Sequence, residues 1–261
     1  MSRPSYDPRE PRLTYLDKTR VFAEGRDTPR RYLERCLETI ARREPVVQAW
    51  VTLAAEAARS EADRSSARWK AGRPLSPIDG MPIGIKDLVS TRDMPTELGF
   101  AAYKGRQTGE DSASVQALRD GGAVILGKVV TTEMGMSHPG PTTNPWDPRR
   151  TPGGSSSGSA AACAADMVPV CLGTQVGGSI IRPASYCGNY ALKPTQGALN
   201  RGERQGLSQS TLGPHANALE DLWAVACQIA CVAGGDPGAP GLYGPPRAAE
   251  PVKPRRLAVI E

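Results

Sequence analysis

The sequence predicts an α/β fold in which helices cover a mixed central β-sheet. Three short apolar segments, 81–86, 123–128 and 167–173, are predicted to be buried strands. Helical patterns lie between them, and strands that alternate with helices are typical of a layered α/β domain. With 261 residues, the chain is long enough to bury a full core.

Capping residues and the spacing of apolar residues predict the helices. Thr28 is a good N-cap and Pro29 suits the first helical position, so a helix begins there and is expected to end at Pro45. Asn217 is predicted to cap a late helix that turns four residues inward: Leu219, Leu222, Ile229 and Val232. The other predicted elements are an extended stretch at 46–53 and helices at 54–70, 112–120 and 159–166.

Composition divides the chain into one domain and its flanks. Residues 1–14 carry many Pro and Arg residues and are expected to be disordered, and the domain is expected to span 15–235. A linker is predicted at 236–254, because 11 of the 21 residues from 234 to 254 are Gly or Pro. Residues 255–261 would start a further strand, so we expect a sheet that is incomplete at the C-terminus.

The overall charge and the cysteine content exclude few partners but set the class of protein. The net charge of +5 is dispersed, which requires no nucleic-acid surface. No segment is apolar enough for a signal peptide or a membrane span. Six cysteines lie mostly in apolar stretches, which predicts a reduced cytoplasmic protein. With two histidines, neither near a cysteine pair, we expect no metal site and no cofactor.

Two serine clusters flanked by glycines stand out, one at 153–158 and one at 174–179. Serine beside glycine is a typical setting for a nucleophile, because bare backbone N–H groups can face a developing oxyanion. A flexible Gly/Ser-rich loop is the alternative interpretation. Apolar segments lead into and out of the clusters, which favours a structured site over a loop.

A serine hydroxyl needs a base, and a neutral lysine can serve where histidine is scarce. A free lysine has a pKa of about 10.4, so burial must bring that pKa to roughly 7–8. The base is therefore expected in an apolar strand, where Lys86, Lys128 and Lys193 are candidates. The residue pattern alone does not choose among them.

A different hydrolase is also conceivable from residues 154–158, which satisfy the pattern Gly-x-Ser-x-Gly of a nucleophile elbow. Ser156 would then be the nucleophile and His215 its base. Such an elbow follows a strand directly, whereas residues 147–153 have the composition of a loop. The pattern therefore disfavours this alternative.

The serine clusters and several flanking motifs together resemble the amidase signature family. The resemblance covers roughly residues 28–233 and rests on eight segments: Asp79–Asp87 (DGMPIGIKD), Gly127–Lys128, Thr132–Gly135 (TEMG), Asn144–Asp147 (NPWD), Gly153–Ala162 (GGSSSGSAAA), Gly173–Ala184 (GTQVGGSIIRPA), Cys187–Gly188 and Leu192–Thr195 (LKPT). It implies the family's mixed sheet and a Ser–cis-Ser–Lys triad, with Ser179 as nucleophile, Ser155 as the bridging cis serine and Lys86 as base. It also assigns the oxyanion hole to the N–H groups around Val176, Gly177 and Gly178, and supporting hydrogen bonds to Ser156 and Thr174.

The chain departs from the common family pattern near the nucleophile. Gln175 stands where many members carry Asp, and Arg182 lies three residues after Ser179 because a second Ile intervenes. This variant resembles malonamidase-like members, in which that Arg meets a substrate carboxylate; a structural ion pair is the alternative role. Met134 is expected either to line the substrate pocket or to pack in a loop.

These observations predict an amide hydrolase that forms an acyl-enzyme on Ser179 and releases ammonia or an amine from a small, carboxylate-bearing amide. The alternative is a non-catalytic fragment or a partner-binding protein similar to the amidase subunit of the tRNA-dependent amidotransferase. Family members are considerably longer, so part of the sheet and the far wall of the site are expected to be absent. The predicted partner is a small-molecule amide, with neither membrane nor nucleic acid required, and a homodimer or a complementary segment remains open.

Overall fold

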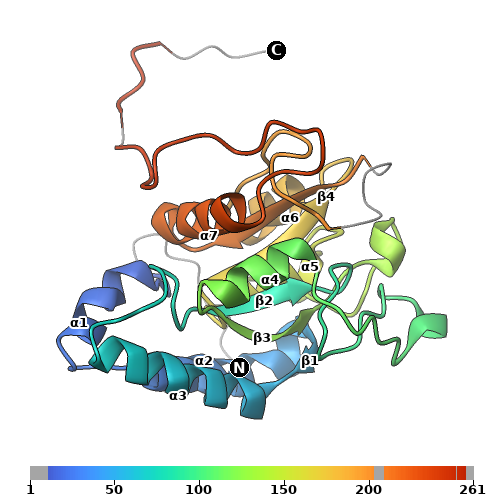
Figure 1. Ribbon diagram of the computed structural model, residues 1–261. Coiled ribbons are helices and arrows are strands. Elements are labelled where there is room, and N and C mark those ends of the chain that lie inside the picture. Colours follow the sequence, from blue (N-terminus) through green and yellow to red (C-terminus); the bar gives the residue numbers. More distant parts are fainter. Residues whose placement is uncertain (1–10, 203–208, 251, 257–261) are drawn as a thin grey trace.

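The computed structural model describes residues 11–202, 209–250 and 252–256 and shows a mixed six-stranded sheet between helices (Figure 1). The strand order is β1-β3-β2-β4-β6-β5, which confirms the predicted α/β class. The strands are β1 Trp50–Leu53, β2 Pro82–Lys86, β3 Val124–Val129, β4 Val170–Gln175, β5 Tyr190–Ala191 and β6 Thr211–Ala216. The helices are α1 Thr19–Ala23, α2 Pro29–Val47, α3 Ala55–Lys70, α4 Ala113–Asp120, α5 Ser157–Ala164, α6 Ile181–Cys187 and α7 Leu219–Val232, with 3-10 turns at Leu16–Lys18, Ala101–Tyr103 and Glu133–Gly135.

The central three strands are parallel, and this arrangement sets the position of the site. β2 pairs with β3 on one side and with β4 on the other. β1 and β6 are antiparallel to their neighbours, and β5 is antiparallel to β6. Because the carboxyl ends of parallel strands meet at one edge, Lys86 at the end of β2 lies near Thr174 at the end of β4.

Two apolar cores lie on the two faces of the sheet, because successive strand residues point to opposite faces. On one face, α4 and α7 pack over Ile83, Ile85 and Leu172 together with the N-terminal aromatic residues. On the other face, α2, α3 and α5 pack over Leu126 and Cys171. The two cores bury every residue of β2 and β3.

The first half of the chain follows the prediction except at Pro45. Thr28 caps α2 through a hydrogen bond from the Arg31 N–H, and Ser112 caps α4 in the same way. However, α2 continues through Pro45 to Val47, so the expected end at Pro45 was wrong. Pro45 lies in the last turn, and the Gln48 N–H still donates to Glu44 O and closes that turn. The predicted extended stretch is therefore shorter and begins only at Trp50.

The second half contains more corrections. Asn217 does not cap α7; its side chain instead donates to Cys163 O and to Asp166. Leu219 and Val232 are half exposed, whereas Leu222 and Ile229 face the core as predicted. The pattern also missed α6 and β6 entirely. β6 contains a Gly-Pro-His sequence that has weak strand propensity and forms a strand through pairing with β4.

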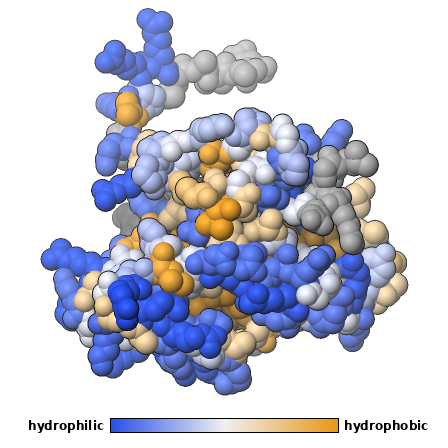
Figure 2. Space-filling view, viewed as in Figure 1, coloured by the Kyte–Doolittle hydropathy of each residue, from blue (hydrophilic) through white to orange (hydrophobic). Residues whose placement is uncertain are grey.

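Residues after α7 form no helix or strand within the part of the chain that the structure describes. The Trp223 indole donates to Pro245 O, so this segment contacts α7. Figure 2 shows a mostly hydrophilic face with apolar residues exposed near α7. The predicted disorder at 1–14 and the predicted strand at 255–261 fall largely outside the described residues.

The described helices include none that is both long and apolar enough to span a bilayer. All six cysteines are free thiols, and four of them are buried: Cys36, Cys163, Cys171 and Cys187.

Candidate active site

Lys86 is the buried end of the central strand β2. Its Nζ donates to Ser155 Oγ at 2.8 Å, to Thr174 Oγ1 at 3.0 Å and to Thr174 O at 3.2 Å. Among the described residues no carboxylate forms an ion pair with it. Burial without a compensating charge lowers the pKa of Lys86 well below its ordinary value. The site therefore favours a neutral amine with a hydroxyl as its neighbour.

Ser155 lies on the loop that leads into α5. The Gly154–Ser155 peptide bond is cis, as the resemblance implies. The backbone of this loop is bound on both sides, because Thr132 N donates to Ser155 O at 3.1 Å and Ser156 N donates to Ser179 O at 3.2 Å. The second bond ties the two serine clusters together although they are distant in sequence.

Ser179 lies between β4 and α6, and 8% of its surface is exposed. It lines the same cavity as Ser155, although no hydrogen bond joins the two hydroxyls among the described residues. The backbone N–H groups of Val176, Gly177 and Gly178 donate to no acceptor in the described parts of the chain. Gly178 has a φ of 135°, which a residue with a side chain rarely adopts. These free donors stand beside the nucleophile candidate.

Ser156 and Thr174 belong to different serine clusters and join them through hydrogen bonds. Ser156 Oγ donates to Thr174 O at 3.2 Å and accepts from Thr174 N at 3.3 Å. Since Thr174 also accepts from Lys86, the four residues Lys86, Ser155, Ser156 and Thr174 form one connected network. The resemblance assigned supporting hydrogen bonds to Ser156 and Thr174, and the roles of base and bridging serine to Lys86 and Ser155.

The other two candidate lysines lie elsewhere. Lys128 is fully buried, donates to Thr96 Oγ1 at 2.7 Å and to Val89 O at 2.9 Å, and lies 3.4 Å from an Asp87 carboxylate oxygen. Burial lowers its pKa to about 8, and the Asp87 charge limits that change. Lys193 is exposed and donates to Pro194 O. Neither contacts a serine of the two clusters in the described structure.

The nucleophile-elbow alternative is not supported by the geometry. No strand precedes Ser156 directly, and α5 begins immediately after it. His215 is fully buried in β6, where burial and the Lys86 charge lower its pKa to about 3. Its Nδ1 lies 3.4 Å from Asn189 Oδ1, and no hydrogen bond to Ser156 forms in the described structure.

The two departures near the nucleophile have distinct surroundings. Gln175 Oε1 accepts from the N–H groups of Ile180 and Ile181 at 2.8 and 3.0 Å and thereby caps α6. Arg182 is exposed, and its Nε donates to Gly154 O at 3.1 Å. The described residues include no salt-bridge partner for Arg182, so the structural ion pair expected as its alternative role does not form there.

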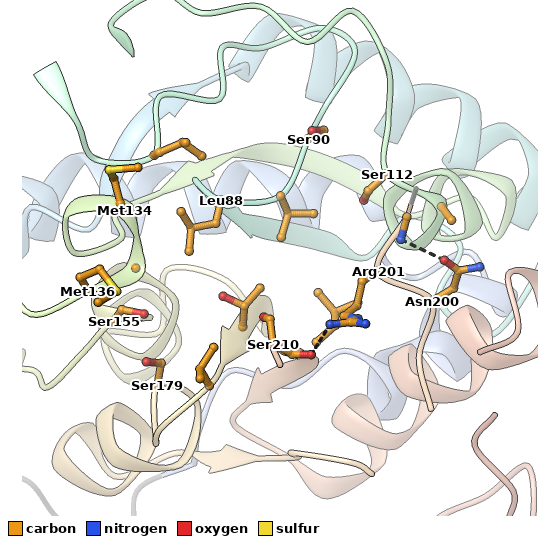
Figure 3. Close-up of a pocket in the computed structure, with 18 of the residues that line it drawn as sticks. Leu88, Ser90, Ser112, Met134, Met136, Ser155, Ser179, Asn200, Arg201 and Ser210 are labelled. Carbon is orange, nitrogen blue, oxygen red and sulfur yellow. Dashed lines mark hydrogen bonds between the residues drawn. The ribbon is translucent and has the colours of Figure 1, made fainter. Parts of the chain in front are cut away.

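A cavity of about 1130 Å³ connects these groups. In Figure 3, Ser155, Ser179 and Met136 lie toward one end, and Ser112, Asn200 and Arg201 toward the other. Met134 lines the cavity and is half exposed. Several residues that line the cavity were not predicted from the sequence, including Leu88, Ser90, Ser112, Asn200, Arg201 and Ser210. Leu88 and Ser90 had one usable signal, because they directly follow the strand that carries Lys86.

Comparisons with known proteins agree with the motifs. The sequence model of the Amidase family matches residues 31–259. The chain is 40% identical over 233 residues to the A subunit of the glutamyl-tRNA(Gln) amidotransferase of Chloroflexus aurantiacus, covering 86% of this chain and 47% of that protein. The chain thus spans about half the length of the curated relatives it matches.

Solved structures show the same relationship. The peptide amidase of Stenotrophomonas maltophilia superposes with a TM-score of 0.79 at 31% identity, over 88% of this chain and 51% of that chain. A protein from a vestigial complex, described as revealing the origins of an s-triazine catabolic enzyme, superposes with a TM-score of 0.78 at 35% identity, over 89% and 52%. The chain therefore belongs to the amidase family, whose signature motifs its two serine clusters carry.

Proposed function

We propose that this chain carries an amide-hydrolysing site in which Lys86 is the base, Ser155 the relay and Ser179 the nucleophile. One observation carries the proposal: a buried lysine that has no carboxylate partner among the described residues has its Nζ 2.8 Å from the Ser155 Oγ, close enough to accept the hydroxyl proton. A neutral amine in that position can accept a proton at neutral pH, which an ordinary lysine cannot. The relatives are about twice as long as this chain, so we also propose, as part of this function, that the chain has the activity of a whole amidase.

Acylation begins when Ser179 Oγ attacks the carbonyl carbon of the amide. Its proton passes to Ser155 Oγ, while the Ser155 proton passes to Lys86 Nζ. The carbonyl oxygen becomes an oxyanion that the N–H groups of Val176, Gly177 and Gly178 can stabilise. The separated serine hydroxyls would approach each other once substrate is bound, as hydrogen bonds in unoccupied sites commonly tighten on binding.

The C–N bond then breaks. Ser155 gives its proton to the leaving nitrogen and regains one from Lys86, so ammonia or an amine departs as a neutral molecule. An ester remains on Ser179. Water attacks this ester by the same proton route and releases the carboxylic acid, which returns all three residues to their starting state.

The cavity favours a small amide that carries an anionic group. Arg182 lines the cavity beside Ser179 and has no carboxylate partner among the described residues. A guanidinium is a planar fork that suits a carboxylate. The exposed Met134 would contact the apolar part of the substrate.

The relatives favour a second candidate function. Several curated proteins that this chain resembles, at 40% identity or near it, are A subunits of glutamyl-tRNA(Gln) amidotransferases. The chain could thus be a subunit whose released ammonia is used by a partner, or a segment that binds a partner without catalysis. Two measurements separate these functions from a solitary hydrolase. Light scattering gives the mass of the protein in solution, and an ammonia assay shows whether the same preparation hydrolyses amides.

The direct test is labelling with a fluorophosphonate and location of the adduct by mass spectrometry. We expect an adduct on Ser179 that disappears in Ser179→Ala and in Lys86→Ala. Ser185→Ala is the matched control, because Ser185 is an exposed serine on α6 outside the cavity. Absence of an adduct from a chain that circular dichroism shows to be folded would contradict the hydrolase proposal and favour partner binding.

A further inference from the structure

His215 lies close to the hydrogen-bond network that holds Lys86. It belongs to β6, which pairs with β4 so that Gly213 lies opposite Gly173. The imidazole occupies the space that Gly173 leaves open: a Cβ at Gly173 would lie 2.8 Å from His215 Nε2 and 2.9 Å from Ser156 Oγ. The ring nitrogen and the Ser156 hydroxyl therefore both border the space that a side chain at position 173 would fill.

The hydrogen bonds of Asn189 fix which ring nitrogen carries the proton. Asn189 Nδ2 donates to Ala160 O at 2.7 Å, so its Oδ1 is the atom that faces His215 Nδ1 at 3.4 Å. An amide oxygen only accepts, and the proton of the neutral ring therefore belongs on Nδ1. Nε2 then presents a lone pair, and this fully buried atom has no hydrogen-bond partner among the described residues. A buried acceptor without a partner needs an explanation.

We propose that His215 is a positioning residue of the triad, whose neutral imidazole offers a lone pair to the Ser156 hydroxyl when Lys86 takes up a proton. This inference rests on the proposed function. In the present arrangement Ser156 Oγ and Lys86 Nζ both donate to the same oxygen, Thr174 O. An ammonium at Lys86 needs that acceptor more than a neutral amine does. Rotation of the Ser156 hydroxyl toward His215 leaves Thr174 O to Lys86.

The surroundings of the ring keep it neutral throughout this exchange. Burial and then the Lys86 charge lower the pKa of His215 to about 3, so protonation of Lys86 does not charge the ring at neutral pH. The thiols of Cys163 and Cys171 are titratable groups on this face, and burial raises the pKa of Cys163; the nearby Asp166 carboxylate accepts a hydrogen bond from Asn217. Asp221 of α7 lies in the core of the opposite face and binds N-terminal backbone N–H groups.

The first test is the pH dependence of Ser179 labelling in four proteins: the natural chain, His215→Leu, His215→Gln and the control His138→Gln. His215→Leu removes the lone pair, which destabilises the ammonium and lowers the pKa of Lys86. We expect its labelling midpoint to move down by about one pH unit and the plateau rate to fall by about threefold to tenfold. His215→Gln keeps a side-chain acceptor, so its midpoint should return toward that of the natural chain. The exposed His138 should have no effect.

The second test needs no activity. Because the chain has two histidines, ¹⁵N-histidine labelling and NMR yield two sets of ring signals, which His138→Gln assigns. We expect His215 to be neutral with its proton on Nδ1 from pH 5 to 8. Its Nε2 signal should shift as Lys86 titrates, and this shift should vanish in Lys86→Met.

The outcomes separate the two proposals. A proton on Nε2, or a His215→Leu midpoint equal to that of the natural chain, overturns the role of His215 while leaving Lys86 as base. A natural chain that is folded but unlabelled at every pH overturns the hydrolase itself. A loss of thermal stability in His215→Leu without a shifted midpoint would reduce His215 to a packing residue.

Discussion

Two fully buried lysines, Lys86 and Lys128, lie on neighbouring parallel strands and are expected to do different work. Each amine donates to three protein oxygens, among them one threonine hydroxyl. The difference is one carboxylate: Asp87 lies 3.4 Å from Lys128, whereas Lys86 has no ion-pair partner in the described residues. Burial lowers both pKa values, but Asp87 holds that of Lys128 at about 8.

The comparison shows that burial alone does not make a lysine a base. A carboxylate partner favours the charged amine, which then holds chain segments together through its ion pair and hydrogen bonds. Lys128 accordingly holds Val89 and Thr96, which belong to the segment that follows β2 and borders the cavity. A hydroxyl partner instead gives the amine a group with which it can exchange a proton. Asp87 is adjacent to Lys86 in sequence, yet it serves the other lysine.

Replacing Lys86 should have the largest effect on chemistry. We expect Lys86→Met to lower the rate of Ser179 labelling on the order of 10³-fold, because the nucleophile loses its base. Thermal stability at pH 7 should stay equal or rise, since the variant removes a buried amine that burial penalises in its charged form. Initial labelling rates and thermal melts measure the two effects. A melting temperature that falls together with the labelling rate would indicate that Lys86 stabilises the fold, as Lys128 does.

Replacing Lys128 should reverse this pattern. We expect Lys128→Met to destabilise the fold by about 3–5 kcal/mol, because it leaves the Asp87 carboxylate buried without its partner. Urea unfolding gives the free energy. The double variant Lys128→Met/Asp87→Asn removes the orphaned charge and should recover much of the loss. A Lys128→Met protein of natural stability would contradict the role assigned to this ion pair.

The pH dependence of stability should separate the two lysines. The pKa of Lys128 is about 8 in the fold and about 10.4 in the unfolded chain, so the unfolded chain binds more protons between these values. Its contribution therefore disfavours the fold below pH 8 and fades as pH rises to about 10.4. Lys86 acts in the same direction, because burial also lowers its pKa well below the ordinary value, and no carboxylate among the described residues limits that change as Asp87 does for Lys128.

Urea midpoints at three pH values can resolve these two contributions. We expect the midpoint of Lys86→Met to rise less than that of the natural chain from neutral pH upward, whereas the midpoint of the double variant at Lys128 and Asp87 should begin to rise less than that of the natural chain only above about pH 8. If the urea midpoints of Lys86→Met and of the double variant depend on pH in the same way, the two amines titrate alike, which would contradict the difference proposed between them.

Local sequence rules predicted much of this fold but not the elements that depend on pairing. The cap at Thr28 acts through a neighbouring backbone group, so sequence alone was sufficient for it. β6 forms because its backbone pairs with that of β4, and this pairing between distant segments leaves no local signal in the sequence of either strand. Asn217 fits a cap by residue type, yet tertiary contacts with Cys163 and Asp166 take its side chain.

The candidate site shows the same division. Residue pattern left Lys86, Lys128 and Lys193 equal, because all three follow apolar residues. The resemblance chose Lys86, and in the structure Lys86 hydrogen-bonds to Ser155, which lies 69 positions away in the sequence. The cavity residues Asn200, Arg201 and Ser210 had no local signal, since their position at the site depends on the path of the chain after β5.

Lys193 completes the set of lysines and should show the smallest effect. Its side chain is exposed and donates to the adjacent Pro194 O, so replacing it removes little packing and relieves little desolvation. We expect Lys193→Met to change the free energy of unfolding by less than about 0.5 kcal/mol and to leave the labelling rate of Ser179 within about twofold. Urea unfolding and labelling of the same preparations provide the measurement. A large loss of labelling at natural stability would restore Lys193 as a candidate base, because it would show an amine that acts on the serines without belonging to the buried network.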